Sequence, residues 1–248
     1  MPNQCVAHRG FSGIAPENTM AAITLAMEQP YVDWVEVDVQ LSKDGVPLLI
    51  HDFTLNRTTN GRGPVKDKTW AELKALDAGS WKSKAYAGER LISLDEFLDK
   101  ICGRLKANIE VKTEGDMYPG IEEKIITAVR KRHMEQDVVL TSFEPRILAK
   151  IKEIGRGMRT GLIIDGKPKD LLLRLQLLHC SFLSINYRHL TSELAGKAAG
   201  RGIEVMAWTL DDARRMRRVA AMHKDVLICT NRPDIWRKAI KEPDADRV

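Results

Sequence analysis

The sequence predicts an α/β fold, a closed (β/α)8 TIM barrel with a β-hairpin extension after its second strand. Short apolar segments typical of strands alternate with amphipathic segments typical of helices along most of the 248 residues. All but one of the strand-like segments are far enough apart to be parallel neighbours. The length also matches the roughly 250 residues of one such barrel, so we expect a single domain over residues 1–248.

Counting the strands favours the barrel over an open sheet. Strand-like segments begin near residues 4, 34, 46, 107, 138, 159, 182, 204 and 226. The tight Asp44-Gly45 turn joins 34–40 to 46–51, whereas parallel neighbours need a crossover of about a dozen residues. Segment 46–51 must therefore return antiparallel, outside a parallel set of eight. An open doubly wound sheet is the alternative, but no glycine-rich phosphate motif follows the first strand.

Helices are expected between these strands. The first begins after Pro16, with Asn18 as a plausible N-cap, and a short capped helix is expected over 69–73. Further helices are predicted over 93–102, 121–132, 145–154, 169–178, 192–200, 211–221 and 234–240, followed by a polar tail expected to fray. The connection 53–90 has many turn residues and no repeated pattern. We interpret it as a functional lid or an insertion.

Composition excludes several classes of protein. The net charge is only +5, and the basic runs 130–132 and 214–218 contain no aromatic residues, so we expect solvated helix faces and no nucleic-acid partner. No signal peptide or membrane-spanning segment is recognisable. The four cysteines are isolated, show no metal-ligand spacing and lie mostly in apolar surroundings, which is typical of reduced cysteines in a cytoplasmic protein.

The hairpin carries the first candidate site residues. Glu36 and Asp38 are two residues apart, so on a strand they share one face. A two-residue loop at Asp44-Gly45 would place His51 directly opposite Asp38, with their Cβ atoms about 4.5–5.5 Å apart. A three-residue loop would instead place His51 on the other face. The first register, or a bulge that gives the same facing, suits a site that joins His51 to the carboxylates. The alternative at this point is a surface hairpin with a solvated acidic face.

Chemistry-bearing residues recur where predicted strands end, and in a barrel those ends converge on one face. The candidates are His8, Arg9, Glu36, Asp38, His51, Glu110, Lys112 and Trp208. Clustered carboxylates repel unless a cation neutralises them, and oxygen ligands favour Mg²⁺ or Ca²⁺ over zinc. The cationic side chains suit phosphate oxygens, and paired histidines can act as base and acid. Any one of these residues is also compatible with an ordinary rim position, but together they describe phosphodiester cleavage.

These residues lie within motifs that resemble the glycerophosphodiester phosphodiesterases, especially the compact bacterial members. The matching motifs are Ala7-His8-Arg9-Gly10, Pro16-Glu17-Asn18-Thr19, Glu36-Val37-Asp38-Val39, Lys43-Asp44-Gly45, His51-Asp52, Leu55-Asn56-Arg57-Thr58-Thr59-Asn60-Gly61, Leu76-Asp77-Ala78-Gly79-Ser80-Trp81, Gly88-Glu89-Arg90, Asn108-Ile109-Glu110-Val111-Lys112, Ser142-Phe143 and Trp208. They run nearly end to end, and the ordered set is specific although the His-Arg-Gly motif alone is weak.

The resemblance implies a role for each candidate. One divalent cation, Mg²⁺ or Ca²⁺, would be held by Glu36, Asp38 and Glu110. His8 would be the general base and His51 the general acid. Arg9 and Lys112 would bind the phosphate of the substrate, with Glu17 supporting the site from a second layer. Trp208 either forms a wall against the substrate or caps the barrel, and we favour the wall. The connection 53–90 would be the family's insertion, over part of the C-terminal face.

The chain departs from the family pattern at two places. Asn231 stands where the family usually has aspartate in a Thr-Asp-Arg-Pro motif, so one carboxylate is missing. Leu91-Ile92 stands where proline usually follows Glu-Arg-Ile, and we interpret that difference as structural.

The expected activity is metal-dependent hydrolysis of glycerophosphodiesters to sn-glycerol 3-phosphate and an alcohol, by a monomer or homodimer. One alternative is a lysophospholipase D, which would need an apolar channel that 53–90 does not suggest. Another is a barrel that only binds a phosphorylated ligand, but such a protein would not need both histidines. A sugar-phosphate aldolase or isomerase using Lys112 as a Schiff base is a third, disfavoured because adjacent carboxylates keep the amine charged.

Overall fold

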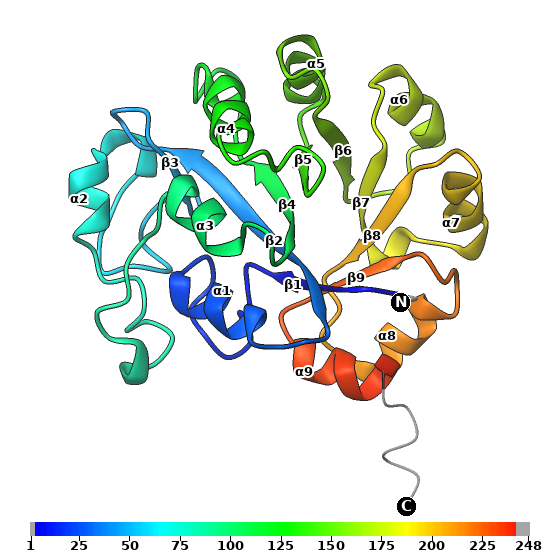
Figure 1. The fold of residues 1–248 in the computed structure, drawn as a ribbon, viewed down its shortest axis with the longest axis horizontal. Coiled ribbons are helices and arrows are strands. Elements are labelled where there is room, and N and C mark those ends of the chain that lie inside the picture. The colour runs from blue at the N-terminus through cyan, green and yellow to red at the C-terminus, as the bar shows by residue number, and fades with distance from the viewer. Residues whose placement is uncertain (1–2, 242–248) are drawn as a thin grey trace, which may run out of the picture.

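The computed structural model describes residues 3–241, and the polar tail predicted to fray lies outside them. Eight parallel strands close into a ring that helices surround (Figure 1). They are β1 (Cys5–His8), β2 (Val32–Leu41), β4 (Lys106–Val111), β5 (Val138–Ser142), β6 (Arg159–Ile164), β7 (Phe182–Asn186), β8 (Glu204–Trp208) and β9 (Leu227–Thr230). Pairing of β1 with both β2 and β9 closes the ring, so the predicted barrel is confirmed.

The helices follow the predicted alternation. They are α1 (Met20–Met27), α2 (Trp70–Lys74), α3 (Leu94–Ile101), α4 (Ile121–Arg130), α5 (Pro145–Ile154), α6 (Leu171–Leu177), α7 (Ser192–Ala199), α8 (Ala213–Ala220) and α9 (Pro233–Trp236), with single turns η1 (Val65–Asp67), η2 (Lys84–Tyr86), η3 (Tyr187–His189) and η4 (Arg237–Lys241). Within residues 3–241, no helix is both long and apolar enough to span a membrane. All four cysteines are free, and only Cys102 is exposed.

Side chains along β2 alternate between the surrounding helices and the interior of the barrel. Val35, Val37 and Val39 are buried against the surrounding helices. On the opposite face, Trp34 packs in the barrel interior against Phe182 of β7, their ring centroids 6.2 Å apart. The carboxylates follow Trp34 on this face toward the C-terminal end of the strand, because side chains two residues apart point the same way.

The hairpin strand β3 (Pro47–Leu49) pairs antiparallel with β2 outside the ring, but not in the predicted register. Gln40 is opposite Leu48, and the Ser42 N–H donates to the Val46 carbonyl at 3.0 Å, so the loop contains three residues rather than two. The third is Gly45, whose φ of +77° supplies the left-handed residue that this longer loop requires. The prediction of a two-residue turn with Asp38 opposite His51 was therefore wrong.

His51 nevertheless reaches the barrel mouth, because β3 ends at Leu49 and the chain bends at His51. The buried side chain of Gln40 holds the bend, since its Nε2 lies 2.9–3.0 Å from the carbonyl oxygens of Ile50, His51 and Asp52. Its Oε1 accepts a hydrogen bond from the Tyr118 hydroxyl at 2.8 Å. The side-chain alternation that a register argument assumes applies only while the strand continues.

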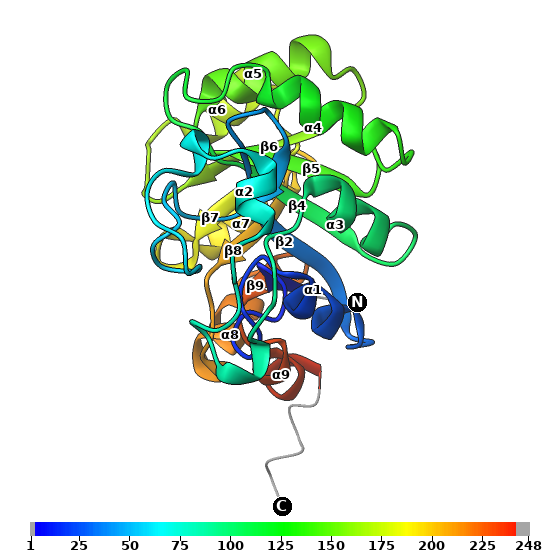
Figure 2. The same ribbon diagram turned by 90° about the vertical axis from the view of Figure 1, so that its left-hand side faces the viewer.

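The insertion 53–90 packs beside β3 on one side of the barrel (Figure 2). A small apolar cluster anchors it, formed by Leu48, Ile50, Leu55, Val65, Leu73, Ala78 and Leu91. The predicted short helix is α2, with a capping box between Thr69 and Glu72. Arg57 and Lys82 connect the insertion to the rim of the barrel.

One predicted helix start was wrong in a way that bears on the site. Thr19, not Asn18, is the N-cap of α1: its side chain accepts from the Ala22 N–H. Asn18 has a left-handed backbone with φ of +58°, and its side chain is buried against Asp38. Asn18 therefore serves a strand residue rather than the helix.

Candidate active site

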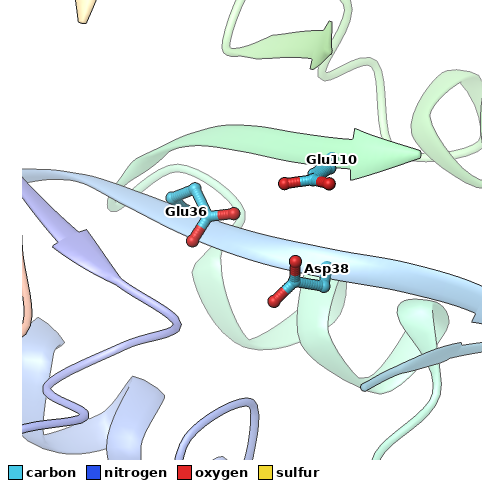
Figure 3. A group of neighbouring side chains, drawn as sticks. All are labelled: Glu36, Asp38 and Glu110. Atoms are coloured by element: carbon cyan, nitrogen blue, oxygen red, sulfur yellow. The ribbon is translucent and has the colours of Figure 1, made fainter. Parts of the chain in front are cut away.

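A group of carboxylates occupies the mouth of the barrel (Figure 3). Glu36 and Asp38 come from β2, and Glu110 comes from the neighbouring strand β4. The parallel register places Asp38 beside Glu110, and one oxygen from each of the three carboxylates lies within 4.8 Å of the others. Glu36 and Asp38 are buried, so water contributes little screening between these charges.

The surroundings of the carboxylates fit a bound cation. Asn18 Nδ2 donates to Asp38 Oδ2 at 2.9 Å, and Arg9 Nε lies 3.1 Å from the same oxygen. Asp38 Oδ1 is buried and has no hydrogen-bond partner among residues 3–241. A buried acceptor without a donor is costly unless a ligand satisfies it. An all-oxygen set of this kind suits Mg²⁺ or Ca²⁺ better than zinc.

The electrostatics of the carboxylates lead to the same conclusion. Burial, and then the charge of Asp38, raises the pKa of Glu36 well above its ordinary value. The same two causes raise the pKa of Glu110 to about 7. With only protein groups present, the three carboxylates therefore resist being ionised together, and a divalent cation would relieve this repulsion.

The turn after β1 is built to hold His8 and Arg9 next to β2. Arg9 and Gly10 both have positive φ, +55° and +79°. A Cβ atom on Gly10 would lie 2.6 Å from the backbone of Ala22, so only glycine fits there. In this conformation the Arg9 N–H approaches both the backbone carbonyl and the carboxylate of Glu36, at 2.8 and 3.1 Å.

His8 is held through its Nδ1 atom, which lies 2.7 Å from Asn231 Oδ1. Its Nε2 faces the carboxylates, 3.7 Å from Glu36 Oε2. Burial, and then the positive charge of Arg9, lowers the pKa of His8 to about 4. The imidazole is therefore neutral at physiological pH, the state that a general base requires.

The Nδ1 atom of His51 has a different partner from that of His8. Its Nδ1 lies 2.7 Å from Asp52 Oδ1, and its Nε2 lies 3.2 Å from Lys112 Nζ. Hydrogen bonds from Arg57 and, against the opposing effect of burial, from His51 hold the pKa of Asp52 well below its ordinary value. Asp52 is thus an ionised carboxylate that accepts from His51 Nδ1, whereas the amine of Lys112 faces Nε2.

The cationic residues are paired with site carboxylates. Lys112 Nζ lies 3.1 Å from Glu110 Oε1. Glu17 bridges two arginines: Arg9 donates to it at 2.8 Å, and Arg57 donates to it at 2.8 and 2.9 Å. Because Arg57 also donates to Asp52, a continuous set of ion pairs links Asp38 to His51.

A cavity of about 120 Å³ lies over these groups. Its lining includes His8, Arg9, Glu36, His51, Glu110, Lys112, Phe143 and Trp208, and no residue of the insertion 53–90. Phe143 and Trp208 meet edge to face, with ring centroids 6.2 Å apart, and form an apolar wall. A larger hollow of about 420 Å³ lies at the opposite end of the barrel, where it is lined by Gln4, Glu204 and Leu227 and by none of the predicted site residues.

Comparison with known proteins places the chain in a family. Residues 8–235 match the model of the glycerophosphoryl diester phosphodiesterase family. The chain belongs to this family.

Two curated relatives illustrate the similarity. A glycerophosphodiester phosphodiesterase of Caldanaerobacter subterraneus subsp. tengcongensis is 38% identical over 232 residues, which cover 92% of this chain and 94% of the relative. One from Bacillus subtilis is 32% identical over 254 residues, covering 95% of this chain and 86% of the relative.

Solved structures of phosphodiesterases share the fold. The phosphodiesterase from Oleispira antarctica, in complex with the product sn-glycerol 3-phosphate, matches with a TM-score of 0.85 and 32% identity, covering 97% of both chains. The glycerophosphodiester phosphodiesterase from Agrobacterium tumefaciens matches with a TM-score of 0.81 and 32% identity, covering 94% of this chain and 98% of that one.

Five residues at the site were not predicted as site residues from the sequence. They are Asn18, Gln40, Asp52, Arg57 and Phe143. Gln40 shares the period-2 face of Glu36 and Asp38, so extending that pattern by one step would have found it. The contacts of Asn18 and Arg57 join segments far apart in the chain, and no local pattern signals them.

Proposed function

We propose that this protein hydrolyses glycerophosphodiesters to sn-glycerol 3-phosphate and an alcohol, in a reaction that depends on a divalent cation. The observation that carries the proposal is the meeting of two histidines, two cations and the carboxylates of Glu36 and Glu110 around one cavity, with the carboxylate of Asp38 beside them. Family membership and the product bound by the Oleispira relative support the substrate class.

The carboxylates of Glu36, Asp38 and Glu110 would hold the cation, and Asp38 Oδ1 has no other partner within residues 3–241. When bound, Mg²⁺ or Ca²⁺ supplies Lewis-acid polarisation of a non-bridging phosphate oxygen. Asn18 and Arg9 orient Asp38 for this task by binding its other oxygen. Arg9 and Lys112, which line the cavity, add fixed positive charge toward the phosphate.

The two histidines are assigned opposite tasks. His8 Nε2, with Nδ1 engaged by Asn231, accepts the proton of the hydroxyl that attacks phosphorus. As the bond from phosphorus to the alcohol breaks, His51 Nε2 donates a proton to the leaving oxygen. For this transfer Lys112 Nζ, which lies 3.2 Å from Nε2 and can only donate, must turn from Nε2 to the phosphate, and the Asp52 carboxylate stabilises the protonated ring. The wall of Phe143 and Trp208 packs against the organic part of the substrate.

The Schiff-base alternative is not favoured by the geometry. A lysine that forms a Schiff base must be neutral when it attacks. Burial opposes the charged form of Lys112, but the carboxylates of Glu110 and Asp38 outweigh it and raise the pKa of Lys112. The amine therefore stays protonated and serves as a fixed charge.

The activity is tested by measuring release of sn-glycerol 3-phosphate from glycerophosphocholine and glycerophosphoethanolamine. The purified protein is first treated with chelator and then supplied with Mg²⁺ or Ca²⁺. We expect no release after chelation and recovery with at least one metal. Absence of product from both substrates with both metals would overturn the proposal.

The cation site is tested separately with Glu36→Gln. This variant should need a higher metal concentration for half-maximal activity, because it removes one anionic ligand. Glu204→Gln is the matched control: Glu204 is paired with Arg159 and lines the hollow at the opposite end of the barrel. An unchanged metal requirement in Glu36→Gln would contradict the ligand assignment.

A further inference from the structure

Asn231, the residue that departs from the family motif, lies between His8 and a second acidic residue. Its Oδ1 is 2.7 Å from His8 Nδ1, and its Nδ2 donates to Asp211 Oδ2 at 2.7 Å. Asp211 lies in the connection between β8 and α8, twenty residues earlier in the chain. A carboxylate therefore lies near His8, but the amide of Asn231 stands between the carboxylate and the imidazole.

The acceptor character of Asp211 decides which way the amide points. An ionised carboxylate only accepts hydrogen bonds, so the NH₂ group of Asn231 must face it and Oδ1 must face the imidazole. Ser12 Oγ lies 2.7 Å from the same Oδ1 but also 2.6 Å from the backbone carbonyl oxygen of His8, so its one hydrogen does not by itself orient the amide. The reversed amide would set two oxygens against each other at Asp211. The network therefore specifies the orientation of Asn231.

Asp211 is itself held in one orientation. Its Oδ1 accepts from the Asn231 backbone N–H at 2.8 Å and from Thr230 Oγ1 at 3.0 Å. Its other oxygen, Oδ2, is then the atom that meets the Asn231 side chain. Thr230 is fully buried at the end of β9, so this arrangement is anchored in the barrel wall.

The orientation of Asn231 has a consequence for His8. An amide oxygen accepts a hydrogen bond, so His8 Nδ1 must carry the hydrogen. A neutral imidazole with hydrogen on Nδ1 has its lone pair on Nε2, the atom that faces Glu36 and the cavity. Only this tautomer can take a proton from an attacking hydroxyl at Nε2.

We propose that Asp211 is a positioning residue which, through the amide of Asn231, holds His8 in the tautomer that acts as a base. The proposal rests on the proposed function for the role of His8 and deepens it. Together, Asp211 and Asn231 provide the oriented hydrogen-bond acceptor for His8 Nδ1 that a single aspartate at position 231 would provide. Asp211 touches neither substrate nor His8, so its effect on turnover depends on the orientation of the amide.

The decisive variant is Asp211→Asn. The new amide keeps its oxygen on the Asn231 N–H and presents an NH₂ group to the Asn231 side chain, which must reverse to accept from it. The reversed Asn231 then offers a donor to His8 Nδ1, which favours hydrogen on Nε2 and removes the base. We expect kcat to fall at least about tenfold with little change in KM, because a wrong tautomer blocks proton transfer.

A second change should restore activity. In the double variant Asp211→Asn/Asn231→Asp, the amide at 211 donates to the carboxylate at 231, which again accepts from His8 Nδ1. We expect most of kcat to return. Asp212→Asn is the charge-matched control, since Asp212 caps α8 by accepting from the Arg215 N–H at 2.9 Å and should leave kcat unchanged. No rescue in a folded double variant would overturn the proposal.

The tautomer can be read independently of activity by ¹⁵N NMR of histidine-labelled protein at a pH where the imidazoles are neutral. The His8 signals are assigned by their loss in His8→Gln. Hydrogen should reside on Nδ1 in the wild type and the double variant, and on Nε2 in Asp211→Asn. The same tautomer in all three proteins would refute the inference. This readout holds whichever substrate the enzyme cleaves, so it fails separately from the proposed function.

Discussion

The two histidines of the cavity differ in the group that contacts their Nδ1 atom. Both are held through Nδ1 at 2.7 Å, but His51 contacts the carboxylate of Asp52 and His8 contacts the neutral amide of Asn231. The His8 side chain is 15% exposed and the His51 side chain 32%. Burial and the neighbouring Arg9 guanidinium lower the pKa of His8 and favour its neutral ring. In the proposed mechanism, this difference in the partner of Nδ1 accompanies the difference between the base and the acid.

The two residues also reach the site by different routes. His8 ends a strand of the closed ring, where it pairs with Glu36 of β2, and the preceding Ala7 pairs with Thr230 of β9. His51 lies beyond the end of the antiparallel strand β3, and the side chain of Gln40 holds its backbone. The position of His8 therefore depends on the sheet, whereas the position of His51 depends on a few specific hydrogen bonds.

The largest expected effect comes from removing each histidine. His8→Ala and His51→Ala should each lower kcat for glycerophosphoethanolamine by about 10²–10⁴-fold. A substrate that releases p-nitrophenol needs no acid to leave. On that substrate His51→Ala should recover most of the wild-type rate, and His8→Ala should not. The opposite pattern in steady-state kinetics would exchange the two roles.

A smaller effect is expected from loosening the bend that carries His51. Gln40→Leu removes the donor to three carbonyls and should lower kcat about 10–100-fold, because small displacements of a catalytic group are costly. Tyr118→Phe is the control, since it removes only the hydrogen bond to Gln40 Oε1. Both should lower the free energy of unfolding in urea by about 1–3 kcal/mol. Equal kcat values for the two variants would show that the bend does not depend on Gln40.

The difference in burial predicts a pH effect on stability that is specific to His8. Its pKa of about 4 in the folded protein is below the ordinary 6.5, so the unfolded chain binds more protons between these values. The contribution of a neutral His8 is therefore complete above pH 6.5 and is lost as the pH falls toward 4. In urea unfolding with chelator present, the wild type should lose more stability between pH 7 and pH 5 than His8→Gln. Equal losses would contradict the burial argument.

The smallest expected effect concerns the apolar wall near both histidines. Phe143→Ala removes the edge-to-face contact with Trp208, which is worth about 0.5–1.5 kcal/mol for such pairs. We expect KM to rise about two- to tenfold with kcat nearly unchanged. Leu177→Ala is a control at another exposed apolar side chain, on α6. A fall in kcat without a change in KM would place Phe143 in the chemical step instead.

Local patterns in the sequence were sufficient for much of the site. The spacing of Glu36 and Asp38 predicted that they share a face, and the strand ends predicted that Glu110 and His8 join them. These predictions succeed because side-chain alternation is a property of each strand and the barrel brings every strand end to the same rim. Asn18 was misassigned, because helix-capping preference says nothing about a strand that packs against the turn.

The sequence by itself determined the barrel, the antiparallel arm and the residues that gather at its mouth, because periodicity and turn chemistry are encoded within short segments. Only the tertiary structure decided three features. They are the three-residue loop of the hairpin, the hydrogen bonds of Gln40 to the bend at His51, and the contact of Asp211 with Asn231. Each of these depends on hydrogen bonds between segments that are distant in sequence or irregular in backbone. Such contacts leave no periodic pattern in the sequence, so they can be recognised only in the folded barrel.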